Sequence, residues 1–460
     1  MTTEQVSNDY LEILESIKED NSIESYQFRE HTPQSQNLNN GHEIIIDVNT
    51  DNSYILPSES YLRIDGQLRK NNANHDAYVA ADEVSLINNA MMYLFDQISY
   101  SIEGKEMERI LCPGQISSML GYLKYPDDYS TSSALESCWS KDTTNNANSS
   151  EFEASIVVPA GGIAAGELTP RKNGNYNQGF HVRKSFLMSA NPRGSFQFFI
   201  PFSHMFGFAE YKKVIWGLKH SLKLTPSSSR NLAIHRNAAA DPGEIFLEQV
   251  SWSIPYVKVE PLSKVRLMEI IENKINIPVS FTARTVESIS VPANCTQFNW
   301  RLSTTGGVEK PRWIIIGFQT DKITTQAQNP AVFDHLSLTN ACIEINSERY
   351  PTFDLNVNFT TNRYLKLYKM FNDFKQEYYG ISSLVGGTQV NLPAFKTLFP
   401  IIVFDVRQQD EKLKSGAVNM KLSFFFGRGV PANTMAYSCV LSDRVFKFAS
   451  DGKSISVKSM

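Results

Sequence analysis

Hydrophobic and polar residues alternate in two stretches of the chain that lie about 240 positions apart. Residues 94–107 read LFDQISYSIEGKEM, and residues 338–351 read LTNACIEINSERYP. Period-two alternation is typical of a strand with one buried face. In both stretches it meets a polar turn, Glu103-Gly104 or Asn346-Ser347, and an amphipathic helical pattern follows. The chain is therefore predicted to build the same supersecondary unit twice.

Short alternating segments make up most of the remaining pattern. The first half contains HEIIIDVN, SYLRIDGQLRK, SFQFFIPF, KVIWGLKHSLKL and EIFLEQVSWSIPYVKV. The second half contains VSFTARTVESISVP, TQFNWRLS, RWIIIGFQTD, LFPIIVFDV, AVNMKLSFFFG and NTMAYSCVLSDRVFKF. No repeat of the length of a propeller blade is present. The pattern predicts an all-β chain of two tandem jelly-roll β-sandwiches, a double jelly roll with flanking helices.

Spacing locates an insertion in the first half. Leu94 and Phe196 are 102 positions apart, whereas their counterparts Leu338 and Leu398 are 60 apart. The excess of 42 is about the length of the Asn-, Ser- and Gly-rich stretch 142–179. We interpret residues 126–180, which contain this stretch, as an exposed surface loop at the outer tip of the first barrel. The predicted divisions are an acidic N-terminal segment 1–40, a first jelly roll 41–260 and a second jelly roll 261–460.

Helical periodicity occurs at a few places between the strands. Ile116, Met119, Leu120 and Leu123 share one face, and LSKVRLMEIIENK (262–274) predicts a short helical connector. The longest pattern is TNRYLKLYKMFNDFKQEYYG (361–380), for which Thr361 or Asn362 is the expected N-cap and Gly380 the C-cap.

The first 40 residues differ from the rest in charge. They hold eight acidic and two basic side chains and one helical stripe, formed by Val6, Tyr10, Ile13, Leu14 and Ile17. The stripe has two interpretations, a helix docked on its own domain or an inter-subunit contact that reaches out on the polar stretch before His42. We predict the inter-subunit contact.

Composition narrows the function classes. The 460 residues carry a net charge of −4 with a pI near 6.1, so no general basic field attracts nucleic acid. The five cysteines form no CxxC pair, which argues against a zinc or redox centre and for a reducing compartment. No signal-peptide pattern opens the chain, and no apolar run approaches the ~20 residues of a transmembrane helix.

Candidate chemistry is sparse. A jelly roll can hold a cupin-type metal site, but no HxH pair occurs among the eight histidines, His31, His42, His75, His181, His204, His220, His235 and His335. His204 and His220 lie among aromatic residues and are predicted to be structural. The Gly-rich VPAGGIAAGE (158–167) lacks the lysine and spacing of a phosphate-binding loop. No catalytic, cofactor-binding or metal-binding residue is therefore predicted, and the chain is not expected to be an enzyme.

Several segments in a fixed order resemble the major capsid protein of Polinton/Maverick elements and adintoviruses. They are FQFFIPFSHMFGFAEYKKVIWGLKHSL, ISVPANCTQFNWRLS, PRWIIIGFQTDK, NPAVFDHLSLTNACIEINSERYP, FKQEYYG, LFPIIVFDVRQQDEKLKSGAVNMKLSFFF and VPANTMAYSCVLSDRVFKFASDGKSISV. The resemblance implies a double jelly-roll subunit of the lineage of adenovirus hexon and virophage capsid proteins. It further implies a homotrimer with a pseudo-hexagonal outline that tiles an icosahedral shell in the virion, beside a penton or minor capsid protein. Synthesis is expected in the host cytoplasm, with the nucleus as a second candidate place of assembly. The acidic N-terminus departs from the basic arm of a genome-binding shell protein, so direct nucleic-acid contact is not expected.

Two other classes stay open from the residues alone. A carbohydrate- or receptor-binding β-sandwich would present exposed aromatic side chains next to Asp or Asn, but the five tryptophans are scattered, mostly in core-like strands. A β-sandwich hydrolase would need paired carboxylates, which no motif identifies.

Overall fold

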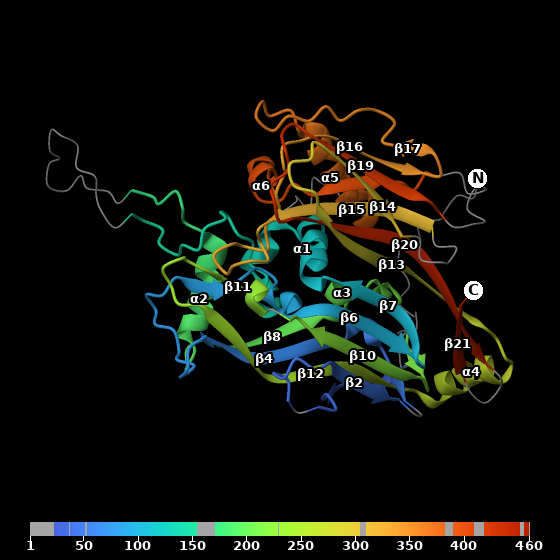
Figure 1. Cartoon of the computed structure of the whole chain (residues 1–460). Helices are drawn as coiled ribbons and strands as arrows, with labels where there is room; N and C mark the ends of the chain where they lie inside the picture. The colour runs from blue at the N-terminus through green and yellow to red at the C-terminus, as the bar shows by residue number, and fades with distance from the viewer. Residues whose placement is uncertain are drawn as a thin grey trace, which may run out of the picture.

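The structure is a computed structural model, and it describes residues 23–35, 37–50, 53–153, 171–228, 230–303, 310–381, 390–408, 418–450 and 455–459 (Figure 1). Strands dominate the described residues, and they form two halves that follow each other along the chain. In Figure 1 the blue and green strands of the first half lie below the orange and red strands of the second half, with helix α1 between them.

The first half is a jelly roll of eight principal strands and two short ones. One of its sheets has the order β1-β12-β4-β8, with the short strands β3 and β9 continuing beside β12, and the facing sheet has the order β2-β10-β6-β7. The strands are β1 Ile23–His31, β2 Ile44–Asn49, β3 Tyr54–Ile55, β4 Tyr61–Lys70, β6 Phe95–Ile102, β7 Lys105–Leu111, β8 Ser195–Pro201, β9 Ile215–Trp216, β10 Lys219–Pro226 and β12 Gly243–Val259. A separate two-stranded ribbon pairs β5 Val84–Leu86 with β11 Ile234–Arg236.

The second half repeats this connectivity. Its sheets have the orders β13-β20-β15-β18 and β14-β19-β16-β17, and β21 adds to the end of β20. The strands are β13 Ile277–Val291, β14 Gln297–Leu302, β15 Lys310–Thr320, β16 Leu338–Ile345, β17 Glu348–Tyr350, β18 Ile402–Asp405, β19 Met420–Phe426, β20 Thr434–Ser450 and β21 Ile455–Ser459. If the eight principal strands of each half are numbered in chain order, both halves have sheets of order 1-8-3-6 and 2-7-4-5. The predicted all-β double jelly roll is confirmed.

The two repeated hairpins have the predicted turns. Ile102 pairs with Lys105 across Glu103-Gly104, and Ile345 pairs with Glu348 across Asn346-Ser347. All four turn residues have positive φ, from 47° to 77°. A two-residue turn of this kind matches the right-handed twist of the strands it joins. The repeated sequence unit therefore corresponds to the fourth and fifth strands of each barrel.

The helices lie between strands. They are α1 Pro113–Lys124, α2 Gln178–Ser189, α3 Phe202–Met205, α4 Pro261–Glu272, α5 Leu365–Tyr379 and α6 Leu392–Thr397, with 3-10 turns η2 Pro57–Glu59, η3 Ala90–Leu94, η4 Asp127–Thr131, η5 Ser133–Ser137, η6 Gly207–Glu210 and η7 Arg230–Ala233. Helices α1, α4 and α5 confirm the three helical patterns, and Gly380 ends α5 in the left-handed conformation as predicted. The expected N-cap is wrong: α5 begins after Tyr364, because Asn362 has a φ of 55° and lies in a turn outside the helix.

The first barrel begins earlier than predicted. Ile23–His31 forms strand β1, and its pairing with β12 runs from Ile23 opposite Val259 to His31 opposite Trp252. The assignment of all of residues 1–40 to a segment outside the barrel is therefore wrong for this strand. Its sequence showed no one-sided alternation because seven of its nine residues are exposed, the other two are half-buried, and three are charged.

The interpretation of 126–180 as surface loop is wrong for its first part. Trp139 is 1% exposed and packs against Tyr122 and Tyr125, with ring centroids 5.2 and 5.1 Å away. Gly121 makes room for it, because a Cβ there would lie 2.2 Å from the indole ring. A few apolar residues thus anchor a mostly polar stretch in the core. Residues 154–170, which include all of VPAGGIAAGE, lie outside the described residues.

Candidate functional site: the joint between the barrels and the exposed faces

A fully buried carboxylate joins the two barrels. Glu108, in β7 of the first barrel, accepts the backbone N–H of Phe208 at 3.1 Å and the backbone N–H of Arg284, in β13 of the second barrel, at 2.9 Å. Burial raises the pKa of Glu108, and Arg284 opposes that rise. One side chain therefore satisfies a backbone donor from each barrel.

The Arg284 side chain reaches across the same junction. Its guanidinium donates to the carbonyl oxygens of Ser203, His204 and Met205, each at 3.0 Å. These carbonyls lie at the end of α3, where they lack partners within the helix. Arg444, in β20, donates to the carbonyl of Met107 at 2.7 Å. Cations of the second barrel thus hold backbone acceptors of the first.

Close packing surrounds these polar contacts. The ring of Phe208 meets Phe281 edge-on at 5.1 Å. Gly207 lies so close to β13 that a Cβ on it would be 2.0 Å from the carbonyl oxygen of Thr282. Glu210 accepts the N–H of Thr282 at 2.9 Å and the hydroxyl of Tyr378 at 2.6 Å. The joint is built from backbone and rings at contact distance, and it fixes the barrels relative to each other.

A second set of contacts lies beside helix α1. Asp142 and Arg183, both within 1% of complete burial, form an ion pair at 2.6 Å in the first barrel. The other oxygen of Asp142 accepts the amide of Asn329, from the second barrel, at 2.9 Å. Tyr93 and Tyr122 donate to the next two carbonyls, Pro330 and Ala331, each at 2.9 Å.

The buried histidines serve structure, as predicted for two of them. His204 bonds Tyr125 and Asn89 at 2.8 and 2.9 Å, and His220 bonds Tyr100 at 2.7 Å. Burial lowers the pKa of His204 and of His220 to about 3, with Lys124 and Arg284 adding to the effect at His204. Both rings are therefore neutral at pH 7. Among the described residues, no three His, Cys, Asp or Glu side chains converge as metal ligands, and no helix is long and apolar enough to span a membrane.

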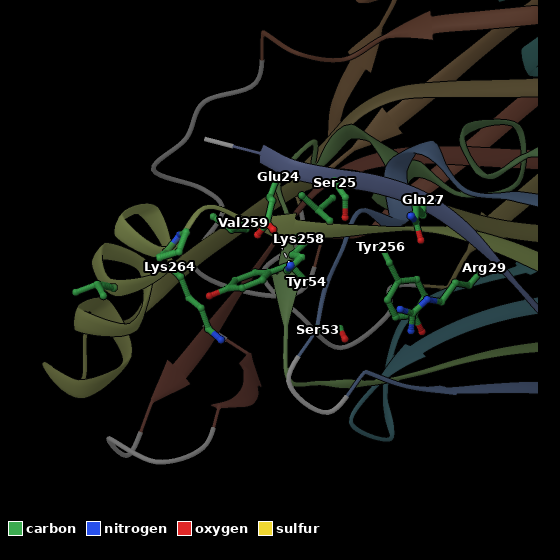
Figure 2. A pocket seen from close by; sticks show the side chains of 13 residues that line it. Glu24, Ser25, Gln27, Arg29, Ser53, Tyr54, Tyr256, Lys258, Val259 and Lys264 are labelled. Atoms are coloured by element: carbon green, nitrogen blue, oxygen red, sulfur yellow. Dashed lines mark hydrogen bonds and ion pairs between the residues drawn. The ribbon is translucent and has the colours of Figure 1, made fainter. Parts of the chain in front are cut away.

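A groove beside β1 is large enough to hold a ligand or a chain segment. It has a volume of about 880 Å³ and lies between β1, the end of β12 and α4 (Figure 2). Its polar features are an ion pair of Lys258 with Glu24 at 2.7 Å and the Arg29 guanidinium 4.3 Å from the ring of Tyr256. Tyr54 places a buried hydroxyl there that has no hydrogen-bond partner among the described residues, and burial raises its pKa. The lining holds opposite charges but no pair of carboxylates suited to acid–base catalysis.

An aromatic row crosses the outer side of the β1-β12-β4-β8 sheet. Tyr26 contacts Phe28 at 5.7 Å, Phe28 contacts Tyr61 at 5.5 Å, and Tyr61 contacts Phe199 at 5.4 Å. The sequence did not reveal this row because its members come from β1, β4 and β8, and β1 was not predicted. We call these four residues the aromatic row.

The predicted contact residues of the N-terminal stripe cannot be placed beside these features. They lie outside the described residues: Val6, Tyr10, Ile13, Leu14 and Ile17. The tryptophans can largely be placed, since Trp139, Trp252, Trp300 and Trp313 are all buried. They offer no exposed indole for the stacking that the carbohydrate-binding interpretation requires.

The class defined by this fold is the double jelly roll, and comparison with known families agrees. Residues 168–446 match the family described as the double jelly roll-like domain, and the chain belongs to that family. No curated protein sequence matches the chain.

Solved structures share the fold over nearly the whole length. A chain of the Sputnik virophage, determined by cryo-EM, has a TM-score of 0.57 at 12% identity and covers 100% of this chain and 93% of its own. The Faustovirus major capsid protein has a TM-score of 0.53 at 7% identity, with coverage of 96% and 93%. The mavirus major capsid protein has a TM-score of 0.50 at 13% identity, with coverage of 94% and 90%. At these identities the likeness establishes a common fold.

Proposed function

We propose that this chain is a major capsid protein, a structural subunit that assembles with copies of itself into the shell of a virion. The observation that carries the proposal is the repeated 1-8-3-6 and 2-7-4-5 connectivity, with both barrels locked together by the buried joint at Glu108 and Arg284. A rigid pair of similar barrels lets three chains imitate a hexagon while each barrel diverges to suit its own neighbours. The major capsid proteins of mavirus and Faustovirus share this architecture, which supports the assignment.

The finer parts of the proposal extend this role. The subunit forms homotrimeric, pseudo-hexagonal capsomers of an icosahedral shell, with a penton or minor capsid protein as an additional partner. The lineage is that of Polinton/Maverick elements and adintoviruses, supported by the ordered segments from FQFFIPF to FKFASDGKSISV. The proposed barrel limits are 23–260 and 261–460, which assign β1 to the first barrel and begin the second at α4. Synthesis in the host cytoplasm, assembly there or in the nucleus, and location in the virion follow from the role. The proposed role involves no catalysis.

The oligomeric state tests the proposal directly. Light scattering of the purified chain should give a particle of three 51.9 kDa subunits, about 156 kDa, at micromolar concentration. Interfaces of an obligate trimer bury on the order of thousands of Å² per subunit, so dilution to nanomolar concentration should not dissociate it. Negative-stain images should show hexagonal outlines. A stable monomer at micromolar concentration would contradict the capsid role.

The N-terminal segment is proposed to act between subunits. Burying the five stripe residues contributes ~1.5–3 kcal/mol each before the cost of ordering the segment, which is a useful contribution to a weak lattice contact. Deletion of residues 1–22 should leave trimers with near-normal melting while assembly into shells weakens. Deletion of residues 1–31 should instead lower the melting temperature strongly, because it removes strand β1 and its pairing with β12.

Two measurements separate these effects, namely melting curves of both deletions and shell yield by sedimentation. If the 1–22 deletion fails to fold, the stripe belongs to the core of its own barrel. If it forms shells as the full chain does, the segment has no role between subunits.

A further inference from the structure

The outer side of the 1-8-3-6 sheet is covered in the second barrel and open in the first, within the described residues. Helix α1 of the first barrel brings Met119 against Gly317, where a Cβ would lie 2.7 Å from the sulfur. Helix α5 covers Trp313 by placing Phe374 edge-on at 4.9 Å. Ile315 and Tyr437, on the same side, are also buried.

The matching side of the first barrel is open within the described part of the chain. It bears the aromatic row, whose members Tyr26 and Phe28 are 40% and 48% exposed. Single exposed rings are common on protein surfaces, but a row of four rings from three strands, each in contact with the next, is characteristic of an interaction site.

Charges on this face are already paired. Arg63 lies 2.6 Å from Asp65 and 3.2 Å from Glu30. An unpaired charge is costly to bury. Because these charges are paired, another protein surface can cover this face without that cost.

The chain also offers a matching apolar surface that lacks a partner among the described residues. Helix α5 follows the fifth strand of the second barrel, as α1 follows the fifth strand of the first. The residue that opens α5, Leu365, is 59% exposed, and Phe353, twelve positions earlier, is 52% exposed with the Lys366 ammonium 5.1 Å from its ring. Helix α5 thus occupies in the second barrel the chain position that α1 occupies in the first.

We propose that the aromatic row is the docking surface for a second copy of this chain, which presents the surface around Phe353 and Leu365 on its second barrel. The contact repeats between chains the joint that exists within one chain. Each barrel then covers the outer sheet of the next, so three chains close a ring of six barrels. This inference rests on the proposed capsid function and specifies its self-association surface.

The test compares two equally accessible phenylalanines. Phe28→Asp should weaken self-association at least 100-fold by light scattering across a dilution series, and Leu365→Asp should do the same from the opposite surface. The matched control is Phe152→Asp, also on the first barrel and 44% exposed but away from the aromatic row, and it should associate as the unaltered chain does. The dissociated Phe28→Asp chain should still unfold cooperatively and keep the circular dichroism spectrum of the unaltered chain, which shows that it is folded.

The outcomes are separable. If the unaltered chain forms trimers and Phe28→Asp forms them equally well, this surface is wrong while the capsid role stands. If the unaltered chain is monomeric, both fail. If Phe28→Asp does not fold, hydroxyl-radical footprinting of the unaltered trimer decides. Tyr26 and Phe28 should be shielded from oxidation, whereas Phe152, which is about equally exposed in the single chain, should be oxidised. Oxidation of Tyr26 and Phe28 to the same extent as Phe152 would overturn the docking surface.

Discussion

Replacing Glu108 by alanine should destabilise the folded chain by about 3–5 kcal/mol. The substitution leaves the N–H groups of Phe208 and Arg284 buried without an acceptor, at ~1–3 kcal/mol each, and opens a small cavity. It also removes the carboxylate that lies beside the Arg284 guanidinium. Because the two donors belong to different barrels, the loss falls on the joint rather than on either core. Calorimetry should then show two separate transitions where the unaltered chain shows one.

The control for this experiment is two residues away on the same strand. Glu106 is exposed and pairs only with Arg109 among the described residues, at 3.0 Å. Glu106→Ala should change stability by no more than ~0.5 kcal/mol. Glu108→Gln should fall between the two, since an amide keeps one acceptor oxygen but points a donor at the second N–H. If Glu108→Ala melts like the control, Glu108 does not join the barrels.

Local patterns predicted the fold because jelly-roll strands carry their own signals. The turns Glu103-Gly104 and Asn346-Ser347 determine two hairpins without reference to the rest of the chain, and Gly380 ends α5 through its own backbone freedom. Most strands of the barrels have one buried face, which gives alternation a visible period.

Strand β1 was not predicted because it does not have one buried and one exposed face. Both faces of Ile23–His31 are largely accessible. Its side chains therefore contact solvent, and in our proposal a second copy of the chain, rather than a hydrophobic core. The stretch around Trp139 was misjudged for a different reason. Composition averaged over a long polar segment hides the one ring that anchors it.

The contacts that join the two barrels could not be predicted from the sequence. Glu108 and Arg284 are separated by 176 positions, and each looks like an ordinary charged residue in an alternating strand. Their roles depend on the placement of two barrels that only tertiary packing determines. The burial of His204 was predicted from its aromatic neighbours in sequence, but the rings that contact it, Tyr125 and Trp139, are distant in sequence.

Asp142→Ala should lower the free energy of unfolding by about 3–5 kcal/mol, as much as Glu108→Ala does. Arg183 would keep a charge in a fully buried site with only backbone carbonyl groups, such as that of Leu86 at 2.8 Å, to balance it. Removing one member of a buried pair is costly because the other is left without compensation. The Asn329 amide, which comes from the second barrel, loses its acceptor as well.

A double substitution distinguishes the stranded charge from simple loss of packing. Asp142→Ala combined with Arg183→Met removes both charges, so urea denaturation should show the double variant to be more stable than Asp142→Ala alone. Asp354→Ala supplies the surface comparison, since Asp354 pairs with Arg349 where both side chains are well exposed, and it should cost no more than ~1 kcal/mol. If the double variant is less stable than Asp142→Ala by the full destabilisation that Arg183→Met causes on its own, the two side chains contribute independently. The pair would then hold the polar stretch in the core by its packing, and the electrostatic account of this site would be wrong.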